Sequence, residues 1–289
     1  MSVDPFVTHR SLLFTVAYEM LGSAADAEDV VQETWLRWAT VDHAEVRDPR
    51  AYLIRIATRQ ALNLLRTLAR RREDYVGEWL PEPLLTAPDV AEDVELAESI
   101  SIAMLTVLET LGPTERAVFV LREVFDTPYE EIAEVVGKTP AAVRQIAHRS
   151  REHVSARRPR MQVDPAVLEH VLEQFVQATR TGKTAALLEV LAPDVVLVAD
   201  GGGFAAAVRR PVEGAAKVAA ILSGLARVAP GFRATTLQVN GAAALVIDVP
   251  GDVPTVITAT VADGRITRLY AMRNPQKLGR MADETALSR

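Results

Sequence analysis

The apolar residues of this chain change their spacing along its length, and this change constrains the fold more than any other feature. Up to about residue 158 they recur every three or four positions, as Leu12, Val16 and Met20 do, which is the spacing of one helix face. From Val195 onward short apolar runs alternate, and two dipeptides of the hairpin-turn type, Asn240-Gly241 and Asp263-Gly264, each join two such runs. The order predicts helical domains first and then an α+β domain with a curved antiparallel sheet.

Prolines and glycines divide this pattern into domains. Two prolines exclude a helix in Trp79-Leu80-Pro81-Glu82-Pro83-Leu84, because proline lacks an amide donor and restricts the residue before it. We predict a helical domain over residues 1–74, a linker over 75–98, a second helical domain over 99–158 and an α+β domain over 164–289. In the last domain we expect helices over about 165–181, 184–191 and 212–228, a strand over 195–199 and a tight turn over 200–203.

The composition excludes several kinds of chemistry. The chain has no cysteine, which removes disulfides and thiol catalysis and argues against a structural zinc site. The apolar run from Ala242 to Val249 is far too short to span a membrane, and the first ten residues lack the pattern of a signal peptide. We therefore expect a cytoplasmic protein without metal, cofactor or membrane contact.

Two compact basic segments lie in an otherwise acidic chain of net charge −6. Residues 49–72 contain seven arginines and no acid, and residues 137–160 contain seven basic side chains and one acidic one. The residues between them, 73–136, hold sixteen acids and two arginines. This distribution is typical of a protein that binds phosphates at two places and repels them elsewhere.

The second basic segment belongs to a helix-turn-helix pattern. Ile132, Ala133, Val136 and Val143 can form its small core, and Gly137 permits the chain reversal between the helices. The second helix then presents a set of side chains to DNA, with Arg149 and Arg151 suited to phosphates: Lys138, Thr139, Ala141, Arg144, Gln145, His148 and Arg149. An ordinary helical hairpin with a solvated basic face is the alternative.

The first basic segment mixes cationic, amide and aromatic groups, including Tyr52 and Gln60. This mixture suits a nucleic-acid surface, including unpaired bases that can stack, and a solubilising arginine face is the alternative. The candidate contacts are Arg50, Arg55, Arg59, Asn63 and Arg66.

An acidic helix precedes it. Acids near a helix amino terminus favour the helix dipole, which by itself explains the pattern, but a face that binds a partner protein also fits it. The candidates for such a face are Asp26, Glu28, Asp29, Gln32, Glu33 and Trp35.

These segments, in this order, resemble the bacterial sigma factors of the extracytoplasmic-function group over residues 6–156. DAEDVVQETWLRW and RAYLIRIATRQALNLLR correspond to sigma region 2, and the segment from LGPTERAVF to AHRSREHV corresponds to region 4. The motifs at Trp79–Pro83, Asp200–Gly203 and Asn274–Leu278 resemble those of the subgroup with a carboxyl-terminal SnoaL-like domain. That domain is a cone-shaped α+β fold also seen in relatives of nuclear transport factor and ketosteroid isomerase. Phe204 and Gln276 depart from the subgroup's usual basic residue and aspartate.

The resemblance implies specific roles for these segments. The helix at residues 26–38 should dock on the β′ clamp helices of core RNA polymerase, and region 4 should reach the β flap. The helix at Arg50–Arg66 should recognise and help melt minus-ten promoter DNA, and the helix at Ala141–His153 should enter the major groove at the minus-thirty-five element. The third domain should regulate the other two through contacts of Trp79, Leu80, Pro81, Glu82, Pro83, Asp200, Gly201, Gly202, Gly203, Asn274, Pro275, Lys277 and Leu278.

Catalysis in the third domain is the main alternative from another class. The titratable candidates are Asp194, Asp200, Asp248, His170 and Tyr270, but no pair of them stands at a compelling spacing, and fold alone does not confer function. We therefore predict no catalytic residue. Binding of a small apolar molecule by the same domain stays open as an alternative. A dimeric helix-turn-helix repressor would leave the first basic helix and the acidic helix unexplained.

Overall fold

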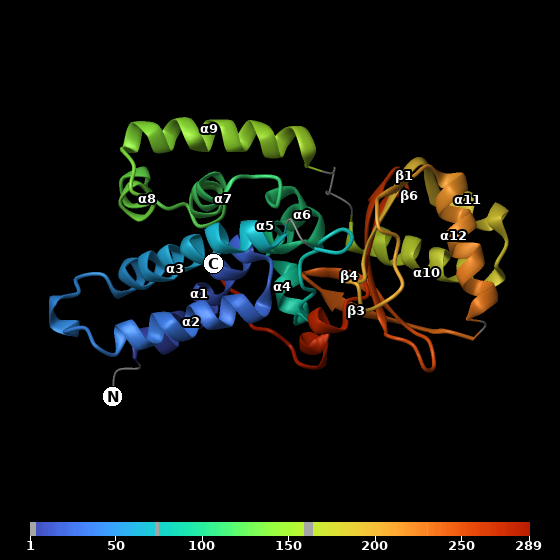
Figure 1. Ribbon diagram of the computed structural model, residues 1–289, viewed down its shortest axis with the longest axis horizontal. Helices are drawn as coiled ribbons and strands as arrows, with labels where there is room; N and C mark the ends of the chain where they lie inside the picture. The colour runs from blue at the N-terminus through green and yellow to red at the C-terminus, as the bar shows by residue number, and fades with distance from the viewer. Residues whose placement is uncertain (1–3, 73–74, 159–163, 230) are drawn as a thin grey trace.

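The computed structural model describes residues 4–72, 75–158, 164–229 and 231–289 (Figure 1). The first domain is a bundle of α1 (Pro5–Leu21), α2 (Ala24–Trp38) and α3 (Pro49–Arg72), with a short 3-10 turn at His43–Glu45. Gly22, at φ 67°, ends α1, and the Ser23 hydroxyl accepts a hydrogen bond from the Asp26 amide (3.2 Å) to begin α2. The Asp48 carboxylate caps α3 through the Ala51 amide (3.0 Å). The three helices confirm the sequence prediction.

The segment predicted as a linker is only partly irregular. Its second half forms α4 (Pro88–Glu92) and α5 (Val94–Ile100). The Asp93 carboxylate starts α5 by accepting from the Leu96 amide (3.1 Å). The acids of this segment serve as helix caps and first-turn residues: Asp93 caps α5, and Asp89 and Glu95 stand in the first turns of α4 and α5.

The second domain contains α6 (Ile102–Leu108), α7 (Pro113–Phe119), a π-helical turn (Val120–Val124), α8 (Tyr129–Val136) and α9 (Pro140–Arg157). Ile132, Ala133, Val136 and Val143 are all buried between α8 and α9, as predicted. The buried side chains of the first and second domains form one continuous apolar core. The two helical domains therefore pack together as a single helical layer in this structure.

The third domain places α10 (Pro165–Thr181), α11 (Thr184–Val190) and α12 (Ala215–Val228) against a six-stranded sheet of order β2-β1-β6-β5-β4-β3. Its strands are β1 (Leu191–Asp200), β2 (Val212–Glu213), β3 (Arg233–Val239), β4 (Ala242–Asp248), β5 (Thr255–Ala262) and β6 (Arg265–Met272). Both hairpin turns are present, with Asn240 at φ 53° and Asp263 at φ 51°. The expectation of a purely antiparallel sheet was wrong, because β1 pairs parallel to β6. No tight turn joins these two strands, so no local signal fixes their direction.

The two faces of this sheet are both covered. The three helices pack on one face, while Leu80 of the linker, Ile102 and Ala103 of α6, and Leu278 and Met281 of the tail pack on the other. Figure 1 shows the carboxyl-terminal segment returning from the third domain to the helical layer, where the last two residues contact α1 and α5. The third domain therefore packs directly against the helical domains. Among the described helices, none is long and apolar enough to cross a membrane.

Candidate nucleic-acid interface and interdomain joint

Helix α9 presents the side chains that the sequence predicts for DNA contact. Thr139 caps it by accepting a hydrogen bond from the Ala142 amide (3.2 Å), directly after the left-handed Gly137. Figure 1 shows α9 at the outer edge of the helical layer. All seven predicted residues are exposed there: Lys138, Thr139, Ala141, Arg144, Gln145, His148 and Arg149. An exposed, largely basic face on the second helix of a helix-turn-helix is the geometry that major-groove binding requires.

The arginines of α9 differ in how they are held. Arg144 lies 3.7 Å from the Glu130 carboxylate on the neighbouring helix, a distance that a small side-chain rotation would change. Arg151 makes two hydrogen bonds to Glu123, at 2.7 and 3.1 Å. Because these bonds engage two of its nitrogens at once, Arg151 is less available to phosphates than the sequence suggested.

The predicted nucleic-acid face of α3 is partly covered by the second domain. Arg50, Arg59, Asn63 and Arg66 are exposed and Arg55 is half-buried. The Arg59 guanidinium donates to the main-chain carbonyl of Glu134 (2.8 Å), and Arg55 lies 3.4 Å from the carboxylate of the same residue. Glu134 belongs to α8, the first helix of the helix-turn-helix. The helix-turn-helix therefore contacts the predicted nucleic-acid face of α3.

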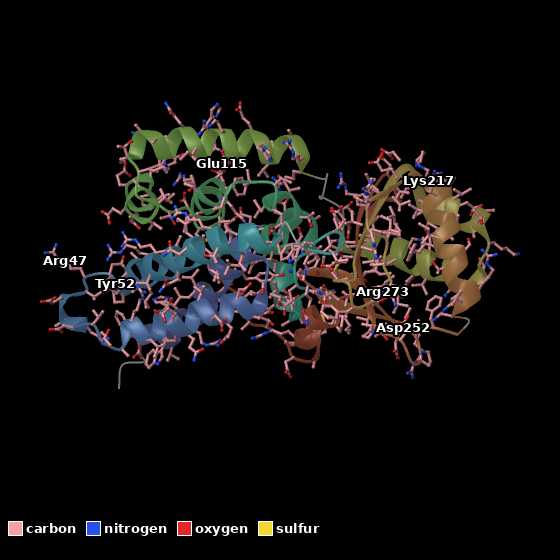
Figure 2. All side chains as sticks on the ribbon, in the orientation of Figure 1. Arg47, Tyr52, Glu115, Lys217, Asp252 and Arg273 are labelled. Carbon is pink, nitrogen blue, oxygen red and sulfur yellow. The ribbon has the colours of Figure 1, made fainter. Side chains whose placement is uncertain are left out.

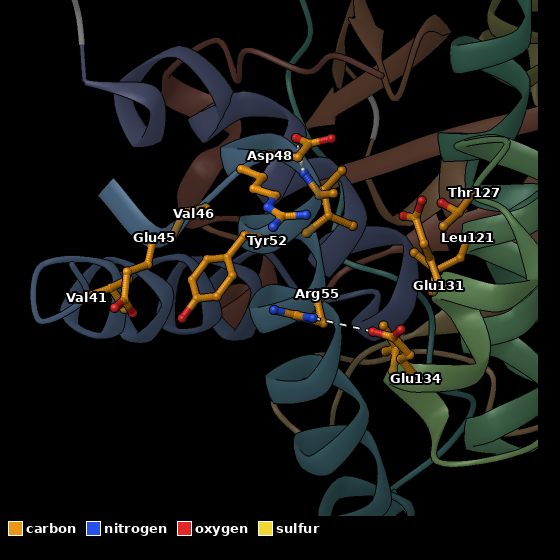
Figure 3. Close-up of a pocket in the computed structure, with 14 residues that line it drawn as sticks. Val41, Glu45, Val46, Asp48, Tyr52, Arg55, Leu121, Thr127, Glu131 and Glu134 are labelled. Carbon is orange, nitrogen blue, oxygen red and sulfur yellow. Dashed lines mark hydrogen bonds and ion pairs between the residues drawn. The ribbon is translucent and has the colours of Figure 1, made fainter. Parts of the chain in front are cut away.

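A pocket of about 460 Å³ lies beside this contact (Figure 3). One wall is the loop at residues 41–48 together with Tyr52 and Arg55, whose guanidinium lies 5.1 Å from the Tyr52 ring centre. Aromatic and guanidinium planes are the groups on which unpaired bases stack. The opposite wall carries Glu131 and Glu134 of α8. These acids give the pocket a negative side that opposes nucleic acid as long as α8 stays in place.

Helix α2 carries an acidic and aromatic surface and lies at the edge of the helical part opposite to α9 (Figure 1). Asp29, Gln32 and Trp35 are exposed, and Asp26, Glu28 and Glu33 are half-buried. Trp35 is 40% exposed, and its ring centre lies 5.0 Å from that of Phe6. Together with Leu36, which is 56% exposed, it forms the kind of aromatic patch that protein interfaces use.

The three signature motifs converge on the buried carboxylate of Asp200. One carboxylate oxygen accepts from the Tyr75 hydroxyl (2.6 Å), and the other accepts from the Leu80 amide (2.9 Å) and forms an ion pair with Lys277 (2.7 Å). The Asn274 side chain donates to the Tyr75 hydroxyl (2.9 Å). Burial raises the pKa of this Tyr75 hydroxyl above its usual range, so it stays a donor. Residues 75 to 80, 200 and 274 to 277 therefore form one joint.

Small residues and one arginine hold the loop after Asp200. A side chain at Gly202 would meet the Asn274 amide nitrogen at 2.2 Å, so only glycine fits at its φ of 59°. Arg273 donates to the Ala206 carbonyl (2.8 Å) and pairs with Asp252 (2.6 Å), and Figure 2 shows both labelled residues at the same edge of the third domain. The two residues that depart from the subgroup, Phe204 and Gln276, are exposed.

The linker motif contacts the first domain with its other side. The Glu82 carboxylate accepts from the Ala24 amide (2.7 Å) at the start of α2, and the Glu82 amide donates to the Gly22 carbonyl (2.8 Å). Burial raises the pKa of Glu82, while the amides at the helix end oppose that rise. Trp79 packs over Gly22, where a side chain would lie 2.7 Å from the ring. The Lys277 ammonium lies 4.0 Å from the Trp79 ring centre. The motif thus connects region-2-like helices to the third domain.

Comparisons with known proteins identify this arrangement. Models of Sigma-70 region 2 and Sigma-70, region 4 match residues 6–71 and 101–154. The chain is similar to the ECF RNA polymerase sigma factor SigJ of Mycobacterium tuberculosis, at 39% identity over 96% of this chain and 93% of that protein. The chain belongs to the ECF RNA polymerase sigma factors. Its backbone also follows the crystal structure of SigJ, with a TM-score of 0.78, 35% identity and coverage of 96% of this chain and 98% of that one.

A second relative extends over the same three domains. The probable ECF RNA polymerase sigma factor SigI of Mycobacterium tuberculosis is 31% identical over 93% of this chain and 92% of that protein. The resemblance inferred from the motifs is therefore confirmed. The predicted fold class is confirmed as well: two all-α domains and a carboxyl-terminal α+β domain.

Sequence reasoning missed one major contact of this sigma factor, at the tip of the β3–β4 hairpin. The Asn240 side chain donates to the Tyr18 hydroxyl and to the Ile100 carbonyl, both at 2.7 Å, and accepts from the Leu84 amide (2.9 Å). One buried side chain thus joins α1, α5, the linker and the third domain. The dipeptide Asn240-Gly241 was interpreted only as a turn, and the hydrogen-bonding capacity of the asparagine was the available signal.

A second missed cluster lies between α1, α5 and α7. Glu19 is fully buried; one carboxylate oxygen accepts from Ser99 (2.7 Å), and the other has no hydrogen-bond partner among the described residues. The buried Arg116 donates twice to the Glu19 main-chain carbonyl (3.0 and 2.8 Å) and pairs with Glu109. Burial raises the pKa of Glu19 to about 8. The only early hint was an acid within the apolar run of α1.

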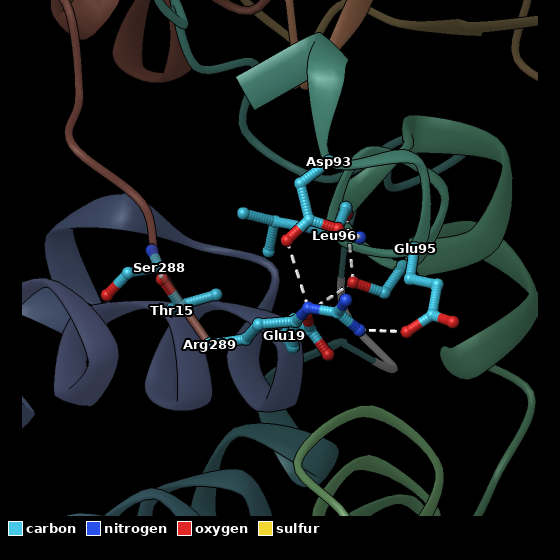
Figure 4. A network of polar contacts seen from close by, with 8 residues as sticks. Thr15, Glu19, Asp93, Glu95, Leu96, Ser288 and Arg289 are labelled. Atoms are coloured by element: carbon cyan, nitrogen blue, oxygen red, sulfur yellow. Dashed lines mark hydrogen bonds and ion pairs between the residues drawn. The ribbon is translucent and has the colours of Figure 1, made fainter. Parts of the chain in front are cut away.

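The last residues reach the same region (Figure 4). The Ser288 amide donates to the Thr15 hydroxyl (3.1 Å), and Arg289 pairs with Asp93 (2.9 Å) and with Glu95. Leu287 packs against the helical core. These contacts extend the tail beyond the motif that the sequence singled out.

A small apolar space lies between the helices and the sheet of the third domain. The space enclosed by Phe175, Leu222, Phe232, Ile247 and their neighbours is about 20 Å³, room for about one water and not for a substrate. The five titratable candidates for catalysis also do not converge. Asp200 and Tyr270 lie on the joint side of the sheet, and Asp194 is exposed on β1. Asp248 pairs with Arg233, and His170 bonds to Gln174. Within the described ranges no three His, Cys, Asp or Glu residues form a metal site.

Proposed function

We propose that this chain binds core RNA polymerase and directs initiation at specific promoters, as a sigma factor whose third domain regulates it in cis. In this proposal α9 reads the minus-thirty-five element and α3, with the loop before it, reads and opens the minus-ten element. The observation that carries it is the pair of basic faces, one on the second helix of a helix-turn-helix and one beside a stacking pocket of Tyr52 and Arg55.

We assign polymerase contact to α2. Its exposed acids and Trp35 suit a basic and apolar partner surface, such as the β′ clamp helices. Region 4 would reach the β flap. The proposal places the protein in the cytoplasm, where polymerase and promoter DNA are, and assigns it no catalytic residue, metal or cofactor.

The arrangement supports a closed, self-restrained state. Elements at minus ten and minus thirty-five lie about 25 base pairs apart, which is about 85 Å of B-form DNA at about 3.4 Å per base pair. Arg59 and Glu134 are instead in hydrogen-bond contact at 2.8 Å. Both elements cannot be bound with α8 on α3, so the two helical domains have to separate. The joint around Asp200 and the tail tether a third domain to both, which keeps the closing contacts at high effective concentration.

Run-off transcription with core RNA polymerase on a library of promoter-like templates tests the proposal. The full chain is expected to give specific transcripts that Arg144→Ala and Arg59→Ala reduce by about tenfold or more. Arg233→Ala is the matched control, because Arg233 is an exposed arginine on β3 far from both helices. Absence of specific initiation with the wild type and with an opened variant would overturn the sigma-factor proposal.

The opened variant is Glu134→Lys. It reverses the charge that faces Arg55 and is expected to raise transcription by weakening the α3–α8 contact. Glu152→Lys makes the same charge change at an exposed position on α9 and controls for a general gain in basic charge. Equal effects of the two substitutions would contradict self-restraint through α8. Removing residues 164–289 is a poorer test, because it would uncover Leu80, Ile102 and Ala103.

A further inference from the structure

A further cavity lies where the third domain meets α4, α5 and the start of the second domain. It has a volume of about 440 Å³, within the range of about 300 to 1,000 Å³ typical of small-molecule sites. Ala91 and Ala97 of α4 and α5 form one side, and Leu168 of α10 with Ala243 and Ala259 of the sheet form the other. Unlike the small space between the helices and the sheet of the third domain, this cavity has walls from both sides of the domain boundary.

The side chains around this cavity are smaller than sheet stability favours. Residues 242–244 of β4 are three consecutive alanines, and alanine is a poor strand former compared with valine or isoleucine. Larger residues at Ala243 and Ala259 would fill the space and join the two domains more tightly. Val94, at the edge of the cavity, is 70% exposed although the elements on both sides of the cavity are packed together. The structure therefore has an apolar cavity at a place where larger side chains would fill it.

The polar groups at the cavity define the chemistry of its occupant. Gln238 lines it, and the carboxamide oxygen of Gln238 is buried without a hydrogen-bond partner among the described residues. The hydroxyls of Ser101 and Thr260 also line it, and both are engaged within the chain, Ser101 as the cap of α6 and Thr260 with Thr267. The two acids at the wall are already engaged, Glu98 with Arg158 and Asp164 as the cap of α10. No lysine, arginine or histidine of the described chain lines the cavity, so its described walls favour a neutral molecule over an anion.

We propose that this cavity binds a neutral, mostly apolar small molecule that carries an N–H or O–H donor, and that binding stabilises the closed arrangement. A ligand in this position contacts α4 and α5 on one side and the sheet on the other. The ligand can contact both walls of the cavity only while the domains are docked. Because a ligand shifts an equilibrium toward the state that it binds better, binding should favour the docked arrangement. The effect on the closed arrangement rests on the proposed function, whereas the binding site does not.

Fluorescence titration with 1-aminoanthracene tests the site. This probe is neutral and aromatic, carries an amine donor, and becomes brighter when it leaves water. The full chain is expected to bind one equivalent saturably. Ala91→Phe and Ala259→Phe fill the cavity from its two sides, and each is expected to weaken binding by about tenfold or more. Ala220→Phe, at an exposed position of α12, is the control and should bind as the wild type does.

Each outcome is decisive. Absence of saturable binding, or binding that survives both cavity substitutions in chains that circular dichroism shows to be folded, overturns the site. Loss with Ala259→Phe alone would place the probe within the third domain and overturn the interdomain cavity. Run-off transcription tests separately whether binding stabilises the closed arrangement. Saturating probe should lower the amount of transcript from the wild type and leave that from Ala91→Phe unchanged. If no template is transcribed at all, the sigma-factor proposal fails while the binding result stands.

Discussion

The Lys277 ammonium lies 2.7 Å from the buried carboxylate of Asp200, in a position where the same carboxylate also accepts from Tyr75 and Leu80. Three donors from the linker and the tail therefore share one acceptor group of the third domain. A fully buried acid can stay charged only with such pairing. The joint depends on the negative charge of this residue and not only on its shape.

Asp200→Asn is expected to lower the free energy of unfolding by about 3 to 5 kcal/mol, because it leaves Lys277 beside an amide that cannot balance its charge. It should also speed protease cleavage within residues 75–87. Urea titration and limited proteolysis measure the two effects. Asp248→Asn changes a half-exposed pair with Arg233 and should cost no more than about 1 kcal/mol. Equal costs for the two substitutions would contradict a special role of the joint.

The two hairpin turns offer a matched test of the second contact. Asn240 and Asp263 have nearly the same backbone conformation, φ 53° and 51°, but only Asn240 reaches other domains. Asn240→Gly keeps the turn and removes three buried hydrogen bonds, so it should cost about 3 kcal/mol of unfolding free energy. Asp263→Gly should change it by less than about 0.5 kcal/mol. A similar loss in both variants would mean that the turn itself, and not the interdomain contact, matters.

Local signals in the sequence were sufficient for most helices and both hairpins. Ser23, Thr139 and Gly137 mark helix ends by their own chemistry, and the structure has helix ends at these residues. The roles of Asn240 and Glu19 could not be predicted in this way. Their partners lie far away in the chain: Tyr18 is 222 residues from Asn240, and Ser99 is 80 residues from Glu19. Only the packed structure shows which turn or which acid has a distant partner.

The resemblance to a family filled part of that gap. It grouped Trp79, Asp200 and Lys277 before any distance was known, and the structure brings them together. It could not indicate that α8 would lie on Arg55 and Arg59, because a closed arrangement depends on the packing of domains and not on motifs. The parallel pairing of β1 with β6 was missed for a similar reason.

The salt dependence of DNA binding distinguishes two neighbouring arginines of α9. Arg149 is exposed, whereas Arg151 is held by two hydrogen bonds to Glu123. If Arg149 contacts a phosphate, Arg149→Ala should reduce the slope of log affinity against log salt by about 0.9. Arg151→Ala should change it by less. Fluorescence anisotropy with a duplex from the transcription screen, at several salt concentrations, measures both. A larger effect of Arg151→Ala would show that the Glu123 pair opens on DNA.

The stability of the closed helical layer should depend on pH through Glu19. Burial raises its pKa from 4.5 to about 8, and the neighbouring Arg116 bonds to the Glu19 main-chain carbonyl and not to the carboxylate. Between these two values the folded chain holds a proton that the unfolded chain has released. Unfolding free energy should therefore fall as pH rises from about 4.5 to about 8, by up to about 1.4 kcal/mol per pH unit from this group, and level off above that.

Glu19→Gln mimics the protonated acid and should remove this part of the slope, so that its stability exceeds that of the wild type increasingly toward pH 8. Urea titrations at several pH values measure the difference between the two chains, in which the other titrating groups cancel. Glu28→Gln, at a half-exposed acid paired with Arg10, is the control and should run parallel to the wild type. If Glu19→Gln also runs parallel, the carboxyl is ionised in the folded chain, and the closed layer tolerates a buried charge beside Ser99.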